Sequence, residues 1–148
     1  MPDQMTFGGP YLQVAAICEK VLSESDGALS LIRMVDRFTV AGQAPEMTPT
    51  PFSFTIFLAF KAGHFRGKAT VIITPTTPTG LQGQGLTLPV LFEGDDERGV
   101  VLRANMNMLI VEDGRHWFDV SILDSVVTRI PMMVVYQQTR IGPHHELL

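Results

Sequence analysis

Glu19 and Arg33 are the residues best placed to do chemistry, because they lie opposite each other on the two strands of a predicted hairpin. An arginine fork inside a β-sandwich can anchor the carboxylate of a ligand. The same two groups can instead form a buried or half-buried ion pair that sets the register of the hairpin. We expect this structural ion pair, and we expect its loss to destabilise the domain.

Two acidic turns supply a second group of polar side chains. Asp95, Asp96 and Glu97 follow one another between two glycines, and Asp113 lies in a later turn. Calcium takes about six to eight oxygen ligands, so the first run can hold the ion only if a second turn such as that of Asp113 joins it. A solvated turn is the default expectation, and calcium binding is the alternative.

The histidines do not form a catalytic set in the sequence. His116, Asp119 and Ser121 fall on one strand, but alternation puts His116 on the face opposite the other two, so they cannot converge as a hydrolase triad. His144 and His145 are adjacent near the C-terminus, whereas a catalytic zinc site needs three convergent ligands. The sequence therefore predicts no enzyme and no cofactor, and it leaves metal binding open.

Met132 and Met133 are a candidate contact surface. Adjacent residues of a strand point to opposite faces, so one of the two is exposed or covered by a partner. Methionine suits adaptable contact surfaces. Charged residues make up 18% of the chain, below the roughly 25% typical of soluble proteins, so much of the surface must be neutral.

Composition limits the class of partner and the compartment. The chain has 148 residues, a net charge of −4 and one cysteine, Cys18, so no intramolecular disulfide can form. An acidic chain without clustered Lys and Arg is not expected to bind nucleic acid. The first ten residues have no signal-peptide pattern, and no apolar run approaches the roughly 18 residues of a membrane-spanning helix. We expect a cytoplasmic protein with no membrane partner.

The elements that must position these residues are β-strands. Eight segments alternate between apolar and polar residues with a period of two. They cover residues 11–22, 29–38, 52–60, 68–74, 86–92, 102–110, 118–122 and 130–137. Residues 42–51 and 75–85 have no apolar period and read as loops. Pro89 and Pro131 cannot donate to a β-ladder, so each should lie at a sheet edge or a bulge.

Three pairs of neighbouring strands are predicted to form hairpins. The first, 11–22 with 29–38, turns at residues 25–27 and pairs Val21 with Leu31 and Ile17 with Val35. The second joins 52–60 to 68–74. The third joins 102–110 to 118–122 through a three-residue turn at 113–115, which places Ile110 opposite Phe118.

Eight strands with apolar faces are most economically packed as two sheets face to face. We therefore expect an all-β fold, an antiparallel β-sandwich of about eight strands that is Ig-like or jelly-roll-like, with a closed β-barrel as the alternative. Residues 11–140 would form this single domain, between an N-terminal arm at 1–10 and a C-terminal tail at 141–148.

The sequence also resembles an uncharacterised bacterial and phage family of β-sandwich proteins. The resemblance is carried by the first hairpin, and it extends to Trp117-Phe118 and Arg129-Ile130-Pro131. In that hairpin the matching residues are Ile17-Cys18-Glu19-Lys20-Val21-Leu22, Asp26-Gly27, Ser30-Leu31-Ile32-Arg33 and Asp36. The resemblance implies a sandwich fold and brings no activity or catalytic residue with it.

Taken together, these patterns favour a non-enzymatic protein-interaction or self-assembly module, with a second copy or another protein as the partner. A small-ligand or calcium-binding sandwich is the alternative.

Overall fold

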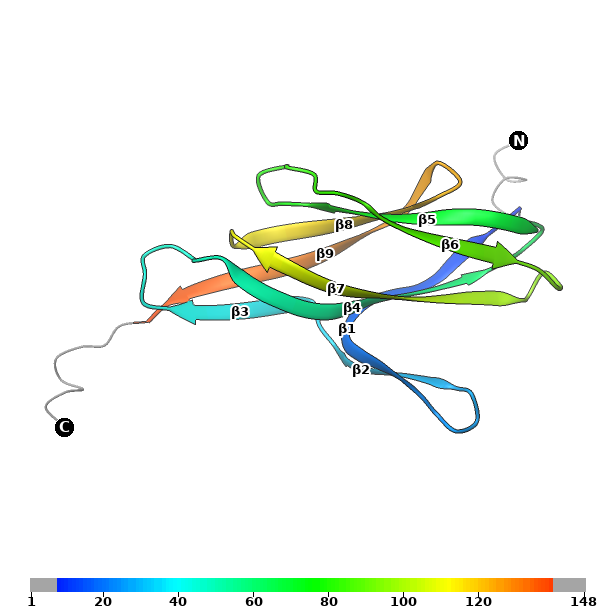
Figure 1. The fold of residues 1–148 in the computed structure, drawn as a ribbon, viewed down its shortest axis with the longest axis horizontal. Helices are drawn as coiled ribbons and strands as arrows, with labels where there is room; N and C mark the ends of the chain where they lie inside the picture. Colours follow the sequence, from blue (N-terminus) through cyan, green and yellow to red (C-terminus); the bar gives the residue numbers. More distant parts are fainter. Residues whose placement is uncertain (1–7, 140–148) are drawn as a thin grey trace, which may run out of the picture.

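The computed structural model describes residues 8–139, and in this range the chain forms nine β-strands and no helix (Figure 1). The strands are β1 (Tyr11–Ser23), β2 (Leu29–Met34), β3 (Arg37–Gly42), β4 (Thr50–Lys61), β5 (Gly67–Thr76), β6 (Leu86–Phe92), β7 (Gly99–Ile110), β8 (Gly114–Ile122) and β9 (Ser125–Gln138). Accordingly, no helix in this part of the chain could cross a membrane.

The nine strands form two sheets that lie face to face. Sheet A has the order β2-β1-β4-β7, and sheet B has the order β3-β9-β8-β5-β6. Figure 1 shows β5 and β8 of sheet B above β4 of sheet A, with these strands running along the long axis of the molecule, while β2 projects below the body. The expected two-sheet sandwich is confirmed, and the alternative of one closed sheet is not what the chain forms.

Alternating apolar residues build the core between the sheets. In β7 the residues with even numbers, from Leu102 to Ile110, are buried or half-buried, while those with odd numbers are exposed. Aromatic rings meet across the two layers, with Phe54 of β4 5.7 Å from Phe118 of β8 between ring centroids. Edge-to-face pairs of this kind stabilise a core beyond the area they bury. The strand faces predicted from alternation are therefore confirmed.

The predicted strand 29–38 is two strands, which gives nine strands where about eight were expected. It breaks at Val35 and Asp36, and β3 then joins sheet B, where it pairs with β9 in parallel. The fold is therefore not fully antiparallel. The physical reason lies in Phe38, which stacks on Phe52 at 5.0 Å between ring centroids and packs against the core. Its burial there draws the chain away from β1.

Two of the three predicted hairpins are wrong. The connections β4–β5 and β7–β8 each cross from sheet A to sheet B. Ile110 and Phe118 both point into the core, as the alternation predicts, but they do so from opposite layers and not as cross-strand neighbours. Alternation tells which side chains point inward, but two strands that face each other across a core satisfy it as well as two that pair.

The first predicted hairpin is confirmed, including its register. Val21 pairs with Leu31, and the amide of Val35 donates to the carbonyl oxygen of Ile17 at 2.8 Å. The turn residues and the alternation of the two flanking strands are local in sequence, so the register could be predicted without knowing how distant strands pair.

The prolines and loops follow the expectations closely. β6, which contains Pro89, is an edge strand of sheet B. Pro131 lies opposite Trp117 of β8, and β3 begins to pair with β9 only at Met133, so no strand of residues 8–139 pairs with Pro131 on its other side. Residues 43–49 and 77–85 contain no strand. Most of the predicted arm, residues 1–7, and the whole predicted tail, 141–148, lie outside the described residues.

Candidate functional site

The first hairpin continues beyond the last pair of β1 with β4 as an arm, residues 19–34, which we call the hairpin arm. The last pair between β1 and β4 joins Cys18 to Thr55, so beyond it β1 pairs only with β2. Figure 1 shows the arm leaving the body on the side of sheet A that faces away from sheet B. At its base Arg33 has a φ of 55°, a left-handed conformation that costs a non-glycine residue about 1–2 kcal/mol.

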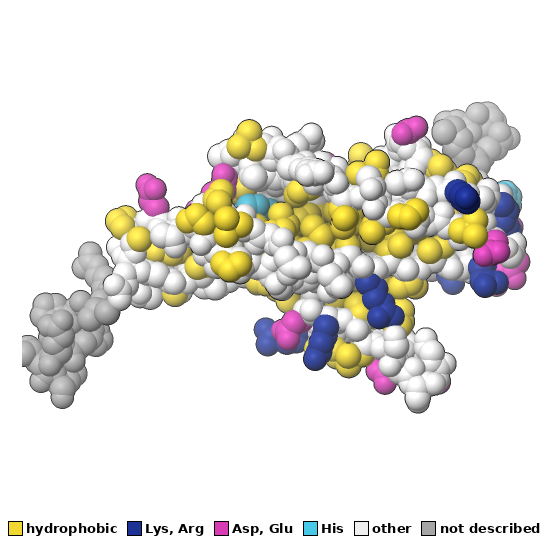
Figure 2. Space-filling view, viewed as in Figure 1, with side chains coloured by type: hydrophobic (Ala, Val, Ile, Leu, Met, Phe, Trp, Pro, Cys, Tyr) yellow, Lys and Arg dark blue, Asp and Glu magenta, His cyan; other side chains and the backbone are white. Residues whose placement is uncertain are grey.

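Apolar side chains are exposed on the arm. Met34 is 71% exposed, and Leu22 is 41% exposed. In Figure 2 the arm is the protrusion below the body, with apolar and charged atoms side by side at its base. Apolar residues occur on both faces of this ribbon, while the core lies on only one side of sheet A. Some of them therefore face solvent.

The predicted pair of Glu19 and Arg33 is formed, but it is not buried. Arg33 Nε lies 3.2 Å from Glu19 Oε2, and the two side chains are 74% and 56% exposed, respectively. The expectation of a buried or half-buried pair was therefore wrong. The pair lies beyond the last contact of β1 with β4, where no second layer covers it. Exposed pairs of this kind contribute about 1 kcal/mol or less to stability.

The base of the arm borders a hollow of about 380 Å³ between the arm and the body. Glu19 and Arg33 line one side of it, and Phe38 and Ser53 line another. Cys18 also borders it, with a side chain that solvent does not reach, and burial raises the pKa of the Cys18 thiol. A raised pKa lowers the thiolate fraction near neutral pH, so Cys18 is a poor nucleophile.

One hydrogen bond ties the arm to the outer face of sheet A. Arg103 of β7 donates from Nη2 to Ser23 Oγ at 2.9 Å. Arg103 is the cross-strand partner of Phe57 in β4, so the two side chains share this outer face, and Phe57 is buried on it. Ser23 is therefore tied to the outer face of sheet A, while Met34 remains exposed.

The acidic turn between β6 and β7 has partners of its own. Asp96 accepts a hydrogen bond from Arg66 Nη2 at 2.7 Å, and its other oxygen lies 3.5 Å from His64 Nε2. Asp95 Oδ1 accepts from the amide of Glu97 at 3.1 Å. The Asp96 carboxylate therefore fastens this turn to the loop between β4 and β5, and Asp95 bonds within the turn, which leaves fewer oxygens free for a cation.

The structure does not bring Asp113 to this turn. Asp113 follows β7, whereas Asp95, Asp96 and Glu97 precede it. A strand of 12 residues at roughly 3.3 Å per residue separates the two turns by about 35 Å. Between residues 8 and 139, no three His, Cys, Asp or Glu side chains gather into a group that could hold a metal ion. The geometry therefore gives the calcium alternative no support.

The two adjacent methionines point in opposite directions, as expected for a strand. Met132 is fully buried in the core, and Met133 is half-buried on the outer face of sheet B. Only Met133 can therefore contact a partner. His116 is buried too, and its Nε2 donates to the carbonyl oxygen of Glu112 at 2.9 Å, a structural use of the ring. His144 and His145 lie outside the described residues.

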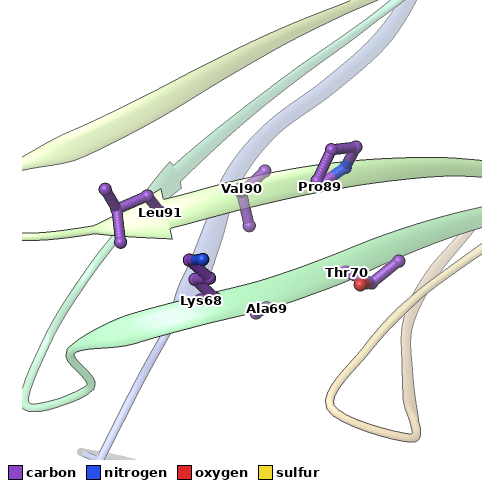
Figure 3. Close-up of a pocket in the computed structure, with 6 residues that line it drawn as sticks. All are labelled: Lys68, Ala69, Thr70, Pro89, Val90 and Leu91. Atoms are coloured by element: carbon purple, nitrogen blue, oxygen red, sulfur yellow. The ribbon is translucent and has the colours of Figure 1, made fainter.

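A further hollow, of about 440 Å³, is lined by the paired strands β5 and β6 (Figure 3). Lys68 of β5 is the cross-strand partner of Leu91, and Thr70 is that of Pro89. Among the described residues, Lys68 is the only ionisable side chain that lines it, and Thr70 is the other polar one. A lysine without a second ionisable group beside it has no partner for acid–base chemistry.

Sequence reasoning missed the exposed apolar residues of the arm. One signal was present, because residues 29, 31, 32 and 34 are all apolar and so break the alternation of a strand with one core face. It also missed that β3, β8 and β9 bring Arg37, Arg115 and Trp117 together with Met133 on the outer face of sheet B.

No family model matches this chain, and neither does any curated protein.

Proposed function

We propose that this chain is a non-enzymatic interaction module that associates with a second copy or with another protein through its hairpin arm. The observation that carries the proposal is the exposure of Met34 and Leu22 on a ribbon that stands out from the body. Burying an apolar side chain of this size stabilises a complex by about 1.5–3 kcal/mol. A complex in which a partner covers the arm is therefore stabilised by apolar burial that the isolated chain lacks.

The rest of the surface supports the same proposal. Figure 2 shows a broad band of apolar atoms along the side of the body where β6 and β7, an edge strand of each sheet, lie close together. Half-buried apolar residues of these strands, among them Leu88, Leu102 and Met106, pack at the margin of the core. Large exposed apolar patches mark contact surfaces more often than catalytic ones.

The polar residues support a module without catalytic activity. His116, Asp119 and Ser121 occupy one strand, but His116 points into the core, while the other two are half-buried on the outer face. Asp119 is bound to Arg129 at 2.6 Å. A nucleophile, its base and an orienting acid must lie within hydrogen-bond reach of one another, and these three do not.

The test is sedimentation of the intact chain over a range of concentrations, together with purification of the tagged chain from its native host. A variant with Leu22→Ser and Met34→Ser removes the apolar contact, and Val126→Ser is the matched control, because Val126 is 62% exposed in β9, away from the arm. We expect the wild type and the control to form a complex of defined stoichiometry, and the arm variant to lose it.

Two results would contradict the proposal. One is a wild-type chain that stays monomeric at about 100 µM, well above the concentrations at which specific complexes form, and that retains no protein at fixed stoichiometry. The other is an arm variant that keeps the same complex as the wild type. Circular dichroism of each variant checks that the sandwich is intact.

A further inference from the structure

The outer face of sheet B carries two arginines around one methionine. Met133 of β9 lies directly opposite Arg115 of β8 on one side and Arg37 of β3 on the other. Neighbouring strands are about 4.8 Å apart, so the two arginine backbones are separated by roughly 10 Å. Both side chains are exposed and on the same face, so their guanidinium groups can reach one anion held above Met133.

An aromatic side chain lies beside these arginines. Trp117 is two residues along β8 from Arg115, and its cross-strand partner is Pro131. One face of the indole is covered by the guanidinium of Arg129, whose Cζ lies 4.5 Å from the ring centroid. Trp117, Pro131 and Met133 join the two arginines in lining a hollow of about 200 Å³.

The charges around this hollow leave two cations without a partner. Arg129 is paired with Asp119 at 2.6 Å. Arg37 and Arg115 form no ion pair with any residue between 8 and 139, and neither does Asp36, which also lines the hollow. The hollow thus has a net positive charge on a chain whose total charge is −4, which suits one carboxylate better than a polyanion.

We propose that this hollow, the Arg37–Arg115–Trp117 site, binds a segment of a partner protein that carries a carboxylate next to an apolar side chain. The two guanidinium groups would bind the carboxylate, and Trp117, Pro131 and Met133 would contact the apolar group. The site is open on the flat face of a sheet, whereas small molecules favour concave pockets that bury most of their surface. An extended peptide can instead lie across the strands. The site lies on the opposite sheet from the hairpin arm and does not depend on the function proposed for the arm.

The chain contains one tryptophan, so its fluorescence reports on this site alone. The probe is the capped peptide acetyl-Gly-Phe-Glu-Gly-amide, titrated into the full chain and compared with the same peptide carrying Gln in place of Glu. We expect a saturable change in Trp117 emission with the Glu peptide, and binding at least about tenfold weaker with the Gln peptide, as the loss of a charge-assisted hydrogen bond implies.

The variants Arg37→Gln and Arg115→Gln should each weaken the Glu peptide by roughly tenfold. Arg98→Gln is the matched control. Arg98 is exposed in the turn between β6 and β7, so this substitution removes the same charge away from the site. We expect Arg98→Gln and the arm variant with Leu22→Ser and Met34→Ser to bind as the wild type does. Normal binding by the arm variant keeps this site separable from the function of the arm.

Three outcomes would overturn the proposal. The first is that no saturable change occurs up to about 10 mM peptide, because a dissociation constant above this concentration is weaker than that of a transient contact. The second is that the Glu and Gln peptides bind equally, or that Arg98→Gln weakens binding as much as Arg37→Gln does. The third is that 3-phenylpropionate, a free aromatic acid, binds as tightly as the peptide, which would assign the site to a small molecule.

Discussion

Arg33 has two properties with opposite effects on stability. Its left-handed backbone costs free energy, while its guanidinium group gains an exposed ion pair with Glu19. The conformation falls where β1 leaves β4 and the ribbon bends toward the outer face of sheet A. Unusual backbone conformations of this kind persist where the surrounding structure enforces them, often at functional segments.

The two effects can be separated by two substitutions. Arg33→Ala removes the ion pair and keeps the backbone cost, so we expect it to lower the free energy of unfolding by about 1 kcal/mol or less. Arg33→Gly removes both, so it should be more stable than Arg33→Ala by about 1 kcal/mol. Urea unfolding of the wild type and both variants measures this. A loss of several kcal/mol in Arg33→Ala would show that the pair contributes as a buried pair does.

At the scale of the element, the hairpin arm is a two-stranded ribbon, whereas the strands of the body belong to sheets of four and five strands. β4 is paired along its whole length with β7 and over much of it with β1, whereas in the arm β2 and the end of β1 pair only with each other. A two-stranded ribbon is marginally stable in water without further packing. The arm relies on its attachment at Cys18 and on the bond from Arg103 to Ser23.

Hydrogen exchange should therefore separate the arm from the body. We expect the amides of β2 to exchange faster than those of β4 and β8 in the free chain, because local opening of the arm exposes little apolar surface. If a partner covers the arm, as we propose, the amides of β2 should become protected in the complex. Equal protection of β2 and β4 in the isolated chain would contradict this view of the arm.

At the scale of the whole molecule, the two sheets are held together by side chains that come from distant parts of the chain. Phe54 of sheet A meets Phe118 of sheet B, and Phe60 of sheet A meets Phe92 of sheet B at 6.5 Å between ring centroids. The chain also crosses from sheet A to sheet B at the β4–β5 connection and again at the β7–β8 connection. Neither sheet is therefore built from one continuous part of the chain. The sandwich should consequently unfold as one unit.

Phe118→Ala tests this cooperativity. Phe118 is fully buried, so its truncation should lower the free energy of unfolding by about 3–5 kcal/mol. The control is Val126→Ala, at an exposed position, for which we expect a change of about 0.5 kcal/mol or less. Thermal unfolding followed by both circular dichroism and Trp117 fluorescence should give one coincident transition. Two separate transitions would mean that the sheets unfold independently.

The sequence by itself determined which segments are strands and which of their faces point inward. It also determined the register of the first hairpin and hence the pairing of Glu19 with Arg33. These are local properties, because the alternation of side chains and the chemistry of a short turn depend on neighbouring residues alone. The sandwich followed from them, since apolar faces on many strands need a second layer to cover them.

Only the tertiary structure decided which sheet each strand joins, whether the ion pair is covered and which surface residues meet. An inward-facing residue satisfies the same pattern whether its neighbour pairs beside it or faces it across the core, so the β7–β8 connection read as a hairpin. The exposure of Arg33 depends on where β4 ends its pairing with β1. The Arg37–Arg115–Trp117 site depends on β3 joining β9, a parallel pairing between residues almost 100 positions apart that no local pattern encodes.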